Sequence, residues 1–439
     1  MKVIFLCGGI GKRMFPLTED KFLFNFIGKT LLEHQIDIAL KAGLKDFVII
    51  GNPGNMKQIE SITDTVKNAH FEFALQRQPL GIADALKCAA AHLNGEILVV
   101  NPNDVFAASA YTNLLRDYNR GTASSYMLGY EVNQYFPGGY LAVNSKNELT
   151  HIVEKPEPGT EPSKLVNILL HLHTDCARLL EYIDRVTTTR DDVYESAMDS
   201  MVKNDYKVKV VHYNDFWAPI KYPWHLFDIV RHFLDNSEGH IASSASISDR
   251  AVITGKVIIG ENVRILENTV IRGPSYIGQN TVIGNSVLVR DYSHIGNNCV
   301  VGFSTEVKCS YVGDSCWFHS CYIGDSIIGN TCSFGAGTVT ANFRFDEKEV
   351  RVRYGDQVRP TGRDKMGAII GNNCKTGINA SILPGRRMGP NSIIGSHVCL
   401  MTDLEPGTTI LNQSSYQVVT NEIELDETKK EELKNKLGK

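Results

Sequence analysis

A glycine-rich loop follows the first apolar segment of the chain, Val3–Leu6. The residues in and after this loop that could do chemistry are Gly8, Gly9, Gly11, Arg13 and Lys21. Glycines placed directly after a strand let backbone N–H groups approach phosphate oxygens. The spacing is not that of a Walker A loop, because Arg13 stands where Ser or Thr must follow the lysine. Met14 replaces the third glycine of a Rossmann fingerprint. The loop therefore predicts a phosphate site of another kind.

A second candidate position is Asp104, which comes shortly after the apolar run Ile97–Val100. Open α/β sheets bind their ligands at the carboxyl ends of the strands. We therefore expect Asp104 to lie at a ligand-binding edge.

The first 235 residues alternate strand-like with helix-like segments. The clearest examples are the apolar runs Val3–Leu6, Phe47–Ile50, Phe71–Ala74 and Ile97–Val100, and the helical patterns Thr30–Ala42 and Ile82–His92. This alternation predicts an α/β, Rossmann-like domain over residues 1–235, with a mostly parallel sheet covered on both faces.

From residue 241 the pattern changes to a period of six. Every sixth position holds a β-branched aliphatic residue: Ile247, Ile253, Ile259, Ile265, Ile271, Ile277, Ile283, Val289, Ile295, Val301 and Val307. A period of six with aliphatic side chains pointing inward predicts a parallel β-helix, three hexads to a coil, over residues 241–415. The spacing alone does not determine its hand.

The hexads slip near Val312 and stop between Ala341 and about Lys365. The interrupting segment is rich in cations: Arg344, Lys348, Arg351, Arg353, Arg359, Arg363 and Lys365. It is either a solvated excursion or an arm that reaches an anionic ligand or a neighbouring subunit. Residues 416–439 are expected to be a charged tail, as a short exposed helix or disordered.

Composition limits the classes of partner. The net charge is −4, which argues against a nucleic-acid-binding surface. The chain holds no apolar run long enough for a membrane span, and the apolar stretch at its start is too short for an export signal. Its ten cysteines form no CxxC pair, so we expect reduced thiols and a cytoplasmic protein.

The loop pattern Gly-Gly-x-Gly-x-Arg-x-x-Pro-Leu-Thr, followed by Lys21, resembles that of the sugar-1-phosphate nucleotidylyltransferases. With the hexads, nearly the whole chain resembles the bifunctional, archaeal-type sugar-1-phosphate nucleotidylyltransferases/amino-sugar acetyltransferases. That family also includes the bacterial bifunctional N-acetylglucosamine-1-phosphate uridylyltransferase. The resemblance implies a left-handed β-helix, Mg²⁺, acetyl-CoA as co-substrate, and a homotrimer or dimer of trimers.

The resemblance also implies roles for residues of the first half. Gly8, Gly9 and Gly11 would wrap the triphosphate, Arg13 would hold the departing pyrophosphate and Lys21 the α-phosphate. Further matching positions are Gln76 and Gly81 for a pyrimidine, Asp104 for the metal, and Gly139, Glu154, Lys155 and Asn167 for the sugar and its phosphate. Nothing in these motifs separates UTP from dTTP.

One departure from the family pattern concerns the metal. The family has Trp-x-Asp-Ile-Gly-x-Pro, whose aspartate is the second metal carboxylate, whereas this chain has Pro219 and, two residues on, Lys221. Proline cannot bind a metal ion. Either Lys221 supplies part of the cationic charge, another carboxylate helps, or nucleotidyl transfer is weakened or lost.

The second half carries a cluster that resembles an acetyltransferase site. The matching positions are Arg290 and Lys308 for the sugar phosphate, His319 as base, and Tyr322 and Asn342 for the sugar. An amine must lose a proton as it attacks a thioester, and a histidine titrating near pH 7 suits that task.

These features predict an enzyme that makes a nucleotide-activated N-acetyl amino sugar. It would acetylate an amino-sugar 1-phosphate, such as glucosamine 1-phosphate or an epimer, and transfer a nucleotidyl group from UTP or dTTP to a sugar 1-phosphate. Two rivals remain: an enzyme with only one functional half, favoured by Pro219, and a non-catalytic regulatory paralogue that binds nucleotide sugars, disfavoured by His319.

Overall fold

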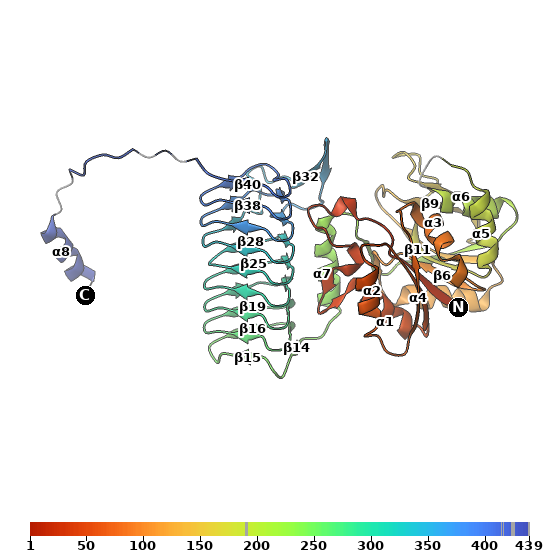
Figure 1. The fold of residues 1–439 in the computed structure, drawn as a ribbon, viewed down its shortest axis with the longest axis horizontal. Coiled ribbons are helices and arrows are strands. Elements are labelled where there is room, and N and C mark those ends of the chain that lie inside the picture. Colours follow the sequence, from red (N-terminus) through yellow and green to blue (C-terminus); the bar gives the residue numbers. More distant parts are fainter. Residues whose placement is uncertain (189–191, 414, 416, 423–425, 438–439) are drawn as a thin grey trace.

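The computed structural model describes residues 1–188, 192–413, 415, 417–422 and 426–437, which form two domains in contact (Figure 1). The first domain is a sheet with helices on both sides. The second is a tall stack of short strands.

The sheet of the first domain has a parallel half and a mixed half. The parallel half has the order β5 (His70–Leu75), β4 (Asp46–Gly51), β1 (Lys2–Leu6) and β6 (Ile97–Val100). In the mixed half, β11 (Leu165–His173) pairs antiparallel with β6, and it is joined by β9 (Gly139–Val143), β10 (Leu149–Glu154), β8 (Ser125–Glu131) and β12 (Val208–Tyr213). The prediction of a mostly parallel sheet is therefore right for the first half only. Beyond it, β9 and β10 pair antiparallel across a short connection, with no crossover helix between them.

Both faces of this sheet are covered, as predicted. Along β1, Val3 and Phe5 point to one buried cluster and Ile4 to another. The first cluster is closed by α1 (Leu31–Lys41), α2 (Met56–Thr63) and α4 (Ser109–Arg120). The second is closed by α3 (Gly81–Cys88), α5 (Cys176–Arg185) and α6 (Val193–Lys203). This arrangement leaves the loops after the strands free to form a site at one edge.

Short elements complete the first domain. They are the 3₁₀ turns Lys12–Met14, Lys21–Leu23, Ala90–His92 and Pro223–His225, the strand pairs β2 (Asn25–Phe26) with β3 (Lys29–Thr30) and β7 (Asp104–Phe106) with β13 (Trp217–Pro219), and helix α7 (Leu226–Asp235). Helix α1 begins at a capping box in which Thr30 and Glu33 bond each other's backbone N–H groups.

The second domain consists of three parallel sheets that wind around one core, consistent with the predicted left-handed β-helix. Sheet I holds β14 (His240–Ile241), β17 (Val257–Ile259), β20 (Ser275–Ile277), β23 (His294–Ile295), β26 (Tyr311–Val312), β29 (Ile327–Ile328), β34 (Ile369–Ile370) and β37 (Arg387–Met388). Sheet II holds β15 (Ser246–Ile247), β18 (Arg264–Ile265), β21 (Val282–Ile283), β24 (Val300–Val301), β27 (Trp317–Phe318), β30 (Ser333–Phe334), β35 (Lys375–Thr376), β38 (Ile393–Ile394) and β40 (Thr409–Ile410). Sheet III holds β16 (Val252–Thr254), β19 (Val270–Arg272), β22 (Leu288–Val289), β25 (Glu306–Lys308), β28 (Tyr322–Gly324), β31 (Val339–Thr340), β36 (Ser381–Ile382) and β39 (Cys399–Leu400).

The hexad aliphatics form the core of the β-helix. From Ile259 to Val307 they are at most 1% exposed, whereas Ile247 and Ile253 in the first coil are only partly buried. Fully burying one such side chain stabilises the fold by roughly 1.5–3 kcal/mol. The slip near Val312 reflects shortened coils. Val307 pairs with Ile323 and Val312 with Ile328, so these partners are closer in sequence than Ile283 and Val301 in a regular coil.

Sheet I faces the first domain. Phe26 packs on Tyr311 with ring centroids 5.9 Å apart, and the backbone N–H of Ile27 donates to His294 Nε2 at 3.3 Å. Phe24, Tyr276 and Ile369 belong to the same buried cluster. The two domains therefore share a continuous apolar interface.

The cationic segment also joins the two domains. It folds into a hairpin of β32 (Arg351–Tyr354) and β33 (Gln357–Pro360), whose Val352 is buried in the interdomain cluster. The hydroxyl of Tyr354 donates to the Phe15 carbonyl oxygen at 3.2 Å, and Arg363 forms an ion pair with Asp228 of α7. At these contacts the segment packs on its own chain, whereas β33 is exposed along its whole length, as a solvated excursion would be. Part of it is apolar, and those side chains pack on the first domain of the same chain.

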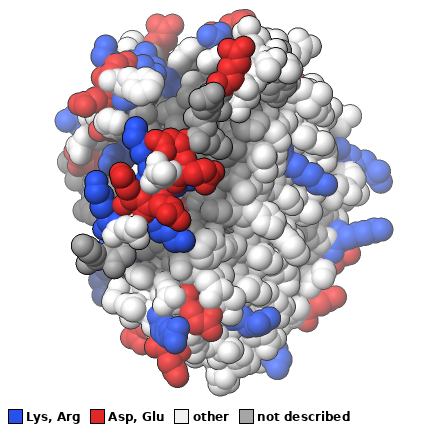
Figure 2. Space-filling model, turned by 90° about the vertical axis from the view of Figure 1, so that its left-hand side faces the viewer, with Lys and Arg blue, Asp and Glu red and all other residues white. Residues whose placement is uncertain are grey.

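The tail ends in an exposed helix, α8 (Glu427–Leu437). On the face seen in Figure 2, charges of both signs are scattered over a largely uncharged surface. Among the described residues, every helix is too short or too polar to cross a lipid bilayer.

Candidate functional site

The glycine loop forms one wall of a pocket at the edge of the first sheet. A Cβ added to Gly8 would lie 2.0 Å from Gln76 Oε1, so only glycine lets the loop approach this amide. A Cβ on Gly9 would meet nothing within 4 Å, which leaves its backbone open to a ligand. The pocket has a volume of about 310 Å³, and its lining includes Gly8, Gly9, Gln76, Gly81, Asn101 and Leu169.

The amide of Gln76 is held in one orientation. Its Nε2 donates to the Gly81 carbonyl oxygen at 3.0 Å and to Asp84 Oδ2 at 2.8 Å, and the residue is 3% exposed. Because both N–H groups are used, the side chain presents its oxygen, beside Gly8, as an acceptor. The predicted base-reading residue is therefore set to accept a hydrogen bond.

The predicted sugar residues lie beside one another, and two of them, Glu154 and Lys155, line a neighbouring pocket. Glu154 pairs with Gly139 across β9 and β10, and a Cβ on Gly139 would lie 3.1 Å from Glu154 Oε2 and 3.6 Å from Asn167 Cβ. Lys155 Nζ forms an ion pair of 2.6 Å with Glu154 Oε1. A space of about 210 Å³ here is lined by Gly81, Ile82, Glu154, Lys155 and Tyr194, among others. Gly81 and Ile82 line both pockets, so the two spaces adjoin.

Asp104 is buried at this edge among cations. Burial raises the pKa of its carboxyl to about 6, and Lys221 and Lys21 oppose that rise. Burial lowers the pKa of Lys21, and the Arg13 charge lowers it further. Lys21 is thus close enough to Asp104 to interact with it electrostatically, and Arg13 is close enough to interact with Lys21 and Lys221.

Pro219 occupies the position directly opposite Asp104 in the β7–β13 pair. Lys221 Nζ donates to the Pro137 carbonyl oxygen at 2.7 Å and lies 3.5 Å from the centre of the Phe136 ring. Burial lowers the pKa of Lys221 to about 8, against the attraction of Asp104. The Asp104 carboxylate therefore has cations of the chain around it, among them Lys21 and Lys221.

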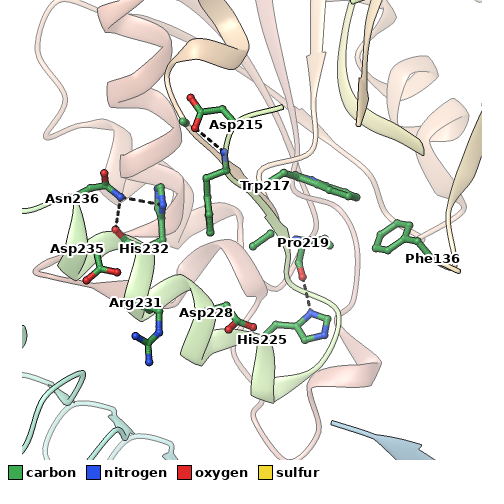
Figure 3. Close-up of a pocket in the computed structure, with 13 residues that line it drawn as sticks. Phe136, Asp215, Trp217, Pro219, His225, Asp228, Arg231, His232, Asp235 and Asn236 are labelled. Carbon is green, nitrogen blue, oxygen red and sulfur yellow. Dashed lines mark hydrogen bonds between the residues drawn. The ribbon is translucent and has the colours of Figure 1, made fainter. Parts of the chain in front are cut away.

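A larger pocket of about 790 Å³ lies between α7 and β13 (Figure 3). His225 Nδ1 is 2.7 Å from the Pro219 carbonyl oxygen, and the His232 ring stacks on Phe216 with centroids 3.7 Å apart. The three carboxylates that line it are engaged, Asp228 with Arg363, Asp215 with Ser109 and Asp235 with Tyr292. These contacts hold the strand that carries Pro219.

The second predicted site lies on sheet III of the β-helix. Lys308 Nζ donates to Asp325 Oδ2 at 2.6 Å, and Asn342 Nδ2 donates to the same carboxylate and, at 3.2 Å, to the Tyr322 hydroxyl. In the adjacent coil, Arg290 Nη1 is 3.2 Å from Glu306 Oε1. Burial disfavours the Lys308 ammonium, but Asp325 outweighs it and raises the pKa of Lys308.

His319 lies apart from this cluster, at the corner between sheets II and III. It follows β27 and is exposed, and its backbone N–H donates to the Phe334 carbonyl oxygen at 3.1 Å. The structure therefore brings Lys308, Tyr322 and Asn342 together and places His319 three residues before Tyr322, with its imidazole open to a ligand.

Comparisons with known proteins agree with both halves. The family described as nucleotidyl transferase matches residues 2–220, and the bacterial transferase hexapeptide family matches residues 367–401. A bifunctional sugar-1-phosphate nucleotidylyltransferase/acetyltransferase of Sulfurisphaera tokodaii is 33% identical over 89% of this chain and 94% of its own length. Proteins named bifunctional protein GlmU, from Methanococcus maripaludis and Methanocaldococcus jannaschii, are 36% and 31% identical, each over 93% of this chain and 97% of their own length.

The chain belongs to the bifunctional sugar-1-phosphate nucleotidylyltransferase/acetyltransferase family. The family membership predicted from the glycine loop and the hexads is therefore confirmed. The family uses a nucleotidyl transferase domain followed by hexapeptide repeats, and this chain has both in that order.

Within this family framework, the residues around Asp104 do not fit a metal held by two carboxylates. Magnesium prefers an octahedron of oxygen ligands, commonly one or two carboxylates together with waters and phosphates. Here the partner position is Pro219, and Lys221 adds a positive charge. Among the described residues, no three His, Cys, Asp or Glu side chains are grouped so that they could hold a metal ion.

Sequence reasoning missed several residues that shape the site. Asp84 orients Gln76, Pro137 and Phe136 hold Lys221, and Asp325 joins Lys308 to Asn342. Two of these could have been found, because Asp325 lies close to Tyr322 in the sequence and Asp84 lies eight residues after Gln76. Phe136 and Pro137 come from a segment far from Lys221, and no local spacing signals that contact.

Proposed function

We propose that this chain makes a nucleotide-activated N-acetyl amino sugar through two separate sites. The β-helix would transfer the acetyl group of acetyl-CoA to the amine of an amino-sugar 1-phosphate. The first domain would transfer a nucleotidyl group from UTP or dTTP to a sugar 1-phosphate and release pyrophosphate. What carries the proposal is the pair of adjoining pockets that share Gly81, one lined by Gln76 and the other by Glu154.

In the nucleotidyl transfer, a phosphate oxygen of the sugar 1-phosphate attacks the α-phosphate, and the bond to pyrophosphate breaks. Backbone N–H groups of Gly8 and Gly9 would bind the triphosphate, with Arg13 and Lys21 neutralising its charge. The fixed oxygen of Gln76 suits the N3–H donor that uracil and thymine share. That match supports a pyrimidine nucleotide and leaves UTP and dTTP equivalent.

In the acetyl transfer, the amine nitrogen attacks the thioester carbon, the C–S bond breaks and CoA leaves as a thiol. His319 would accept the proton that the amine loses. Lys308 and Arg290 would hold the sugar phosphate, with Tyr322 and Asn342 on the sugar. Asp325 supports these roles, because it fixes both Lys308 and Asn342.

We also propose that the enzyme works in the cytoplasm as a homotrimer or a dimer of trimers. All ten cysteines are free thiols, as a reducing compartment requires. An apolar group on sheet II and its corner with sheet III is exposed: Phe303, Trp317, Ile378, Ile393 and Leu411. An exposed apolar patch of this kind is typical of a protein interface. A stable monomer at micromolar concentration in sedimentation would contradict the trimer.

One experiment tests both activities. The full chain is incubated with acetyl-CoA, an amino-sugar 1-phosphate and either UTP or dTTP, while thiol release and pyrophosphate release are measured separately. Release of both products is expected. Release of thiol alone would leave an acetyltransferase, and release of neither would overturn the proposal.

A further inference from the structure

A line of buried polar side chains begins at Asn167, behind the proposed sugar pocket. Asn167 Oδ1 is 2.6 Å from His171 Nε2, and His171 Nδ1 is 2.8 Å from the Tyr194 hydroxyl. The same hydroxyl is 2.8 Å from His173 Nε2, and His173 Nδ1 is 2.9 Å from Ser125 Oγ. The line therefore connects β11, α6 and β8.

The fold brings these groups together through an irregularity in β11. The pairing of β11 with β8 changes register between Ile168 and His171. In a regular strand, residues four apart are about 13 Å apart along the chain. The bulge instead lets the side chains of Asn167 and His171 touch.

Each imidazole in the line carries a single proton. His171, His173, Tyr194 and Ser125 are at most 2% exposed. Burial lowers the pKa of His171 well below its usual value and that of His173 to about 3, so both are neutral at pH 7. A neutral imidazole donates from one nitrogen and accepts at the other.

The donor and acceptor roles along this line of hydrogen bonds are therefore linked to one another. The Tyr194 hydroxyl has one proton, so it can donate to only one of the two histidines. If His171 Nε2–H donates to Asn167 Oδ1, then Tyr194 donates to His171 Nδ1, His173 Nε2–H donates to Tyr194, and Ser125 donates to His173 Nδ1. If His171 instead carries its proton on Nδ1, its Nε2 must accept from the amide nitrogen of Asn167, and Asn167 presents its oxygen.

We propose that His171 is a positioning residue that fixes the amide of Asn167 with its nitrogen available to the sugar. The proposal rests on the proposed function, because it takes the pocket of Gly139 and Glu154 as the sugar site. Tyr194 belongs to this pocket too, since it lines the space together with Glu154 and Lys155. With its oxygen bonded to His171, Asn167 can offer only N–H donors, whereas Glu154 can only accept.

The tautomers of His171 and His173 can be measured by spectroscopy without any catalytic turnover. Nitrogen-15 NMR of the full chain separates the two neutral tautomers of each histidine, and His171→Gln and His173→Gln assign the signals. We expect both residues to carry their proton on Nε2. A proton on Nδ1 of His171 would mean that Asn167 presents its oxygen, and would overturn the proposal.

Tyr194→Phe tests the consequence for the sugar. This variant removes the donor to His171 Nδ1, so His171 can change tautomer and Asn167 can rotate. We expect the dissociation constant for N-acetylglucosamine 1-phosphate, measured by calorimetry, to rise about tenfold, the worth of one hydrogen bond of about 1.4 kcal/mol. The KM for the nucleoside triphosphate and the rate of acetyl transfer should not change.

The matched control is Tyr182→Phe, on the neighbouring helix α5. Tyr182 is 6% exposed and packs on Tyr206, in the same cluster as Tyr194. The Tyr182→Phe variant should leave sugar binding unchanged. If Tyr194→Phe lowers thermal stability but not sugar affinity, the line is only structural and the proposal is wrong. If the wild-type chain binds sugar 1-phosphate yet releases no pyrophosphate, the proposed function fails while this inference can still be judged.

Discussion

Pro219 lies directly opposite Asp104 across the antiparallel pair of β13 and β7. In the family pattern this position carries the second metal carboxylate. The structure adds that Lys221, two residues further on, lies near enough to lower the pKa of Asp104, although burial raises it overall. The site that should bind a divalent cation thus contains a cation of the protein itself.

We expect the native chain to bind Mg²⁺ weakly, so that nucleotidyl transfer needs a high Mg²⁺ concentration, and we expect restoration of the family pattern to lower that concentration. Pro219→Asp with Lys221→Gly would rebuild the two-carboxylate arrangement. It should lower the Mg²⁺ concentration for half-maximal pyrophosphate release. Pro219→Ala is the control that removes the proline without adding a ligand. If the native chain is already saturated at low Mg²⁺ and the restored variant is no better, another group serves as second ligand.

His319→Ala should slow acetyl transfer by about 10²–10⁴-fold, the usual contribution of a general base. Thiol release from acetyl-CoA measures this step, and pyrophosphate release by the first domain should not change. His397 provides the control, because it is exposed at the same corner between sheets II and III in a later coil. An undiminished rate of thiol release in His319→Ala would exclude the residue from the mechanism.

Lys308→Met should weaken binding of the phosphate group in the β-helix site. A hydrogen bond to a charged group contributes about 1.5–3 kcal/mol, so the KM for the amino-sugar 1-phosphate should rise about 10- to 100-fold. The KM for acetyl-CoA should stay the same. Lys375→Met, exposed on sheet II, is the control for loss of a surface charge. Equal effects of the two variants would show that only the overall charge matters.

The interface between the domains should weaken in acid because of His294. This residue is 1% exposed, accepts the N–H of Ile27, and has its pKa lowered by burial to about 4. Between that pKa and the usual 6.5, the unfolded chain binds a proton that the folded chain does not. Stability is therefore complete above pH 6.5 and falls as the pH drops toward 4.

His294→Gln should flatten this dependence by about 1.4 kcal/mol for each pH unit, the effect of one proton. Urea unfolding at pH 7 and pH 5 measures it. His240→Gln, at an exposed position, should leave the slope as it is in the wild type. A slope in His294→Gln equal to that of the wild type would contradict the assignment.

Much of the fold and several site residues could be predicted from local sequence. The period of six places Ile259 and Ile265 in the core, because each hexad repeats the same turn and buries the same position. The glycine loop predicted a phosphate site, and the structure places this loop beside Gln76 at the edge of a pocket. The parallel order of the sheet could be predicted only as far as β6, since β11 pairs antiparallel with β6, β8 and β9, and β10 pairs antiparallel with β9.

The sequence by itself determined the two-domain order, the β-helix, the family and the candidate residues, because these depend on spacing between near neighbours. Only the tertiary structure decided which distant groups meet. Asp104 and Pro219 face each other because β7 and β13 pair. Asn167 is linked to Tyr194 through His171 because β11 is bulged and α6 packs on its sheet. The cationic segment lies on the first domain because Val350 and Val352 are buried between the two domains. Such contacts depend on how elements pack in three dimensions, and no periodicity in one segment encodes them.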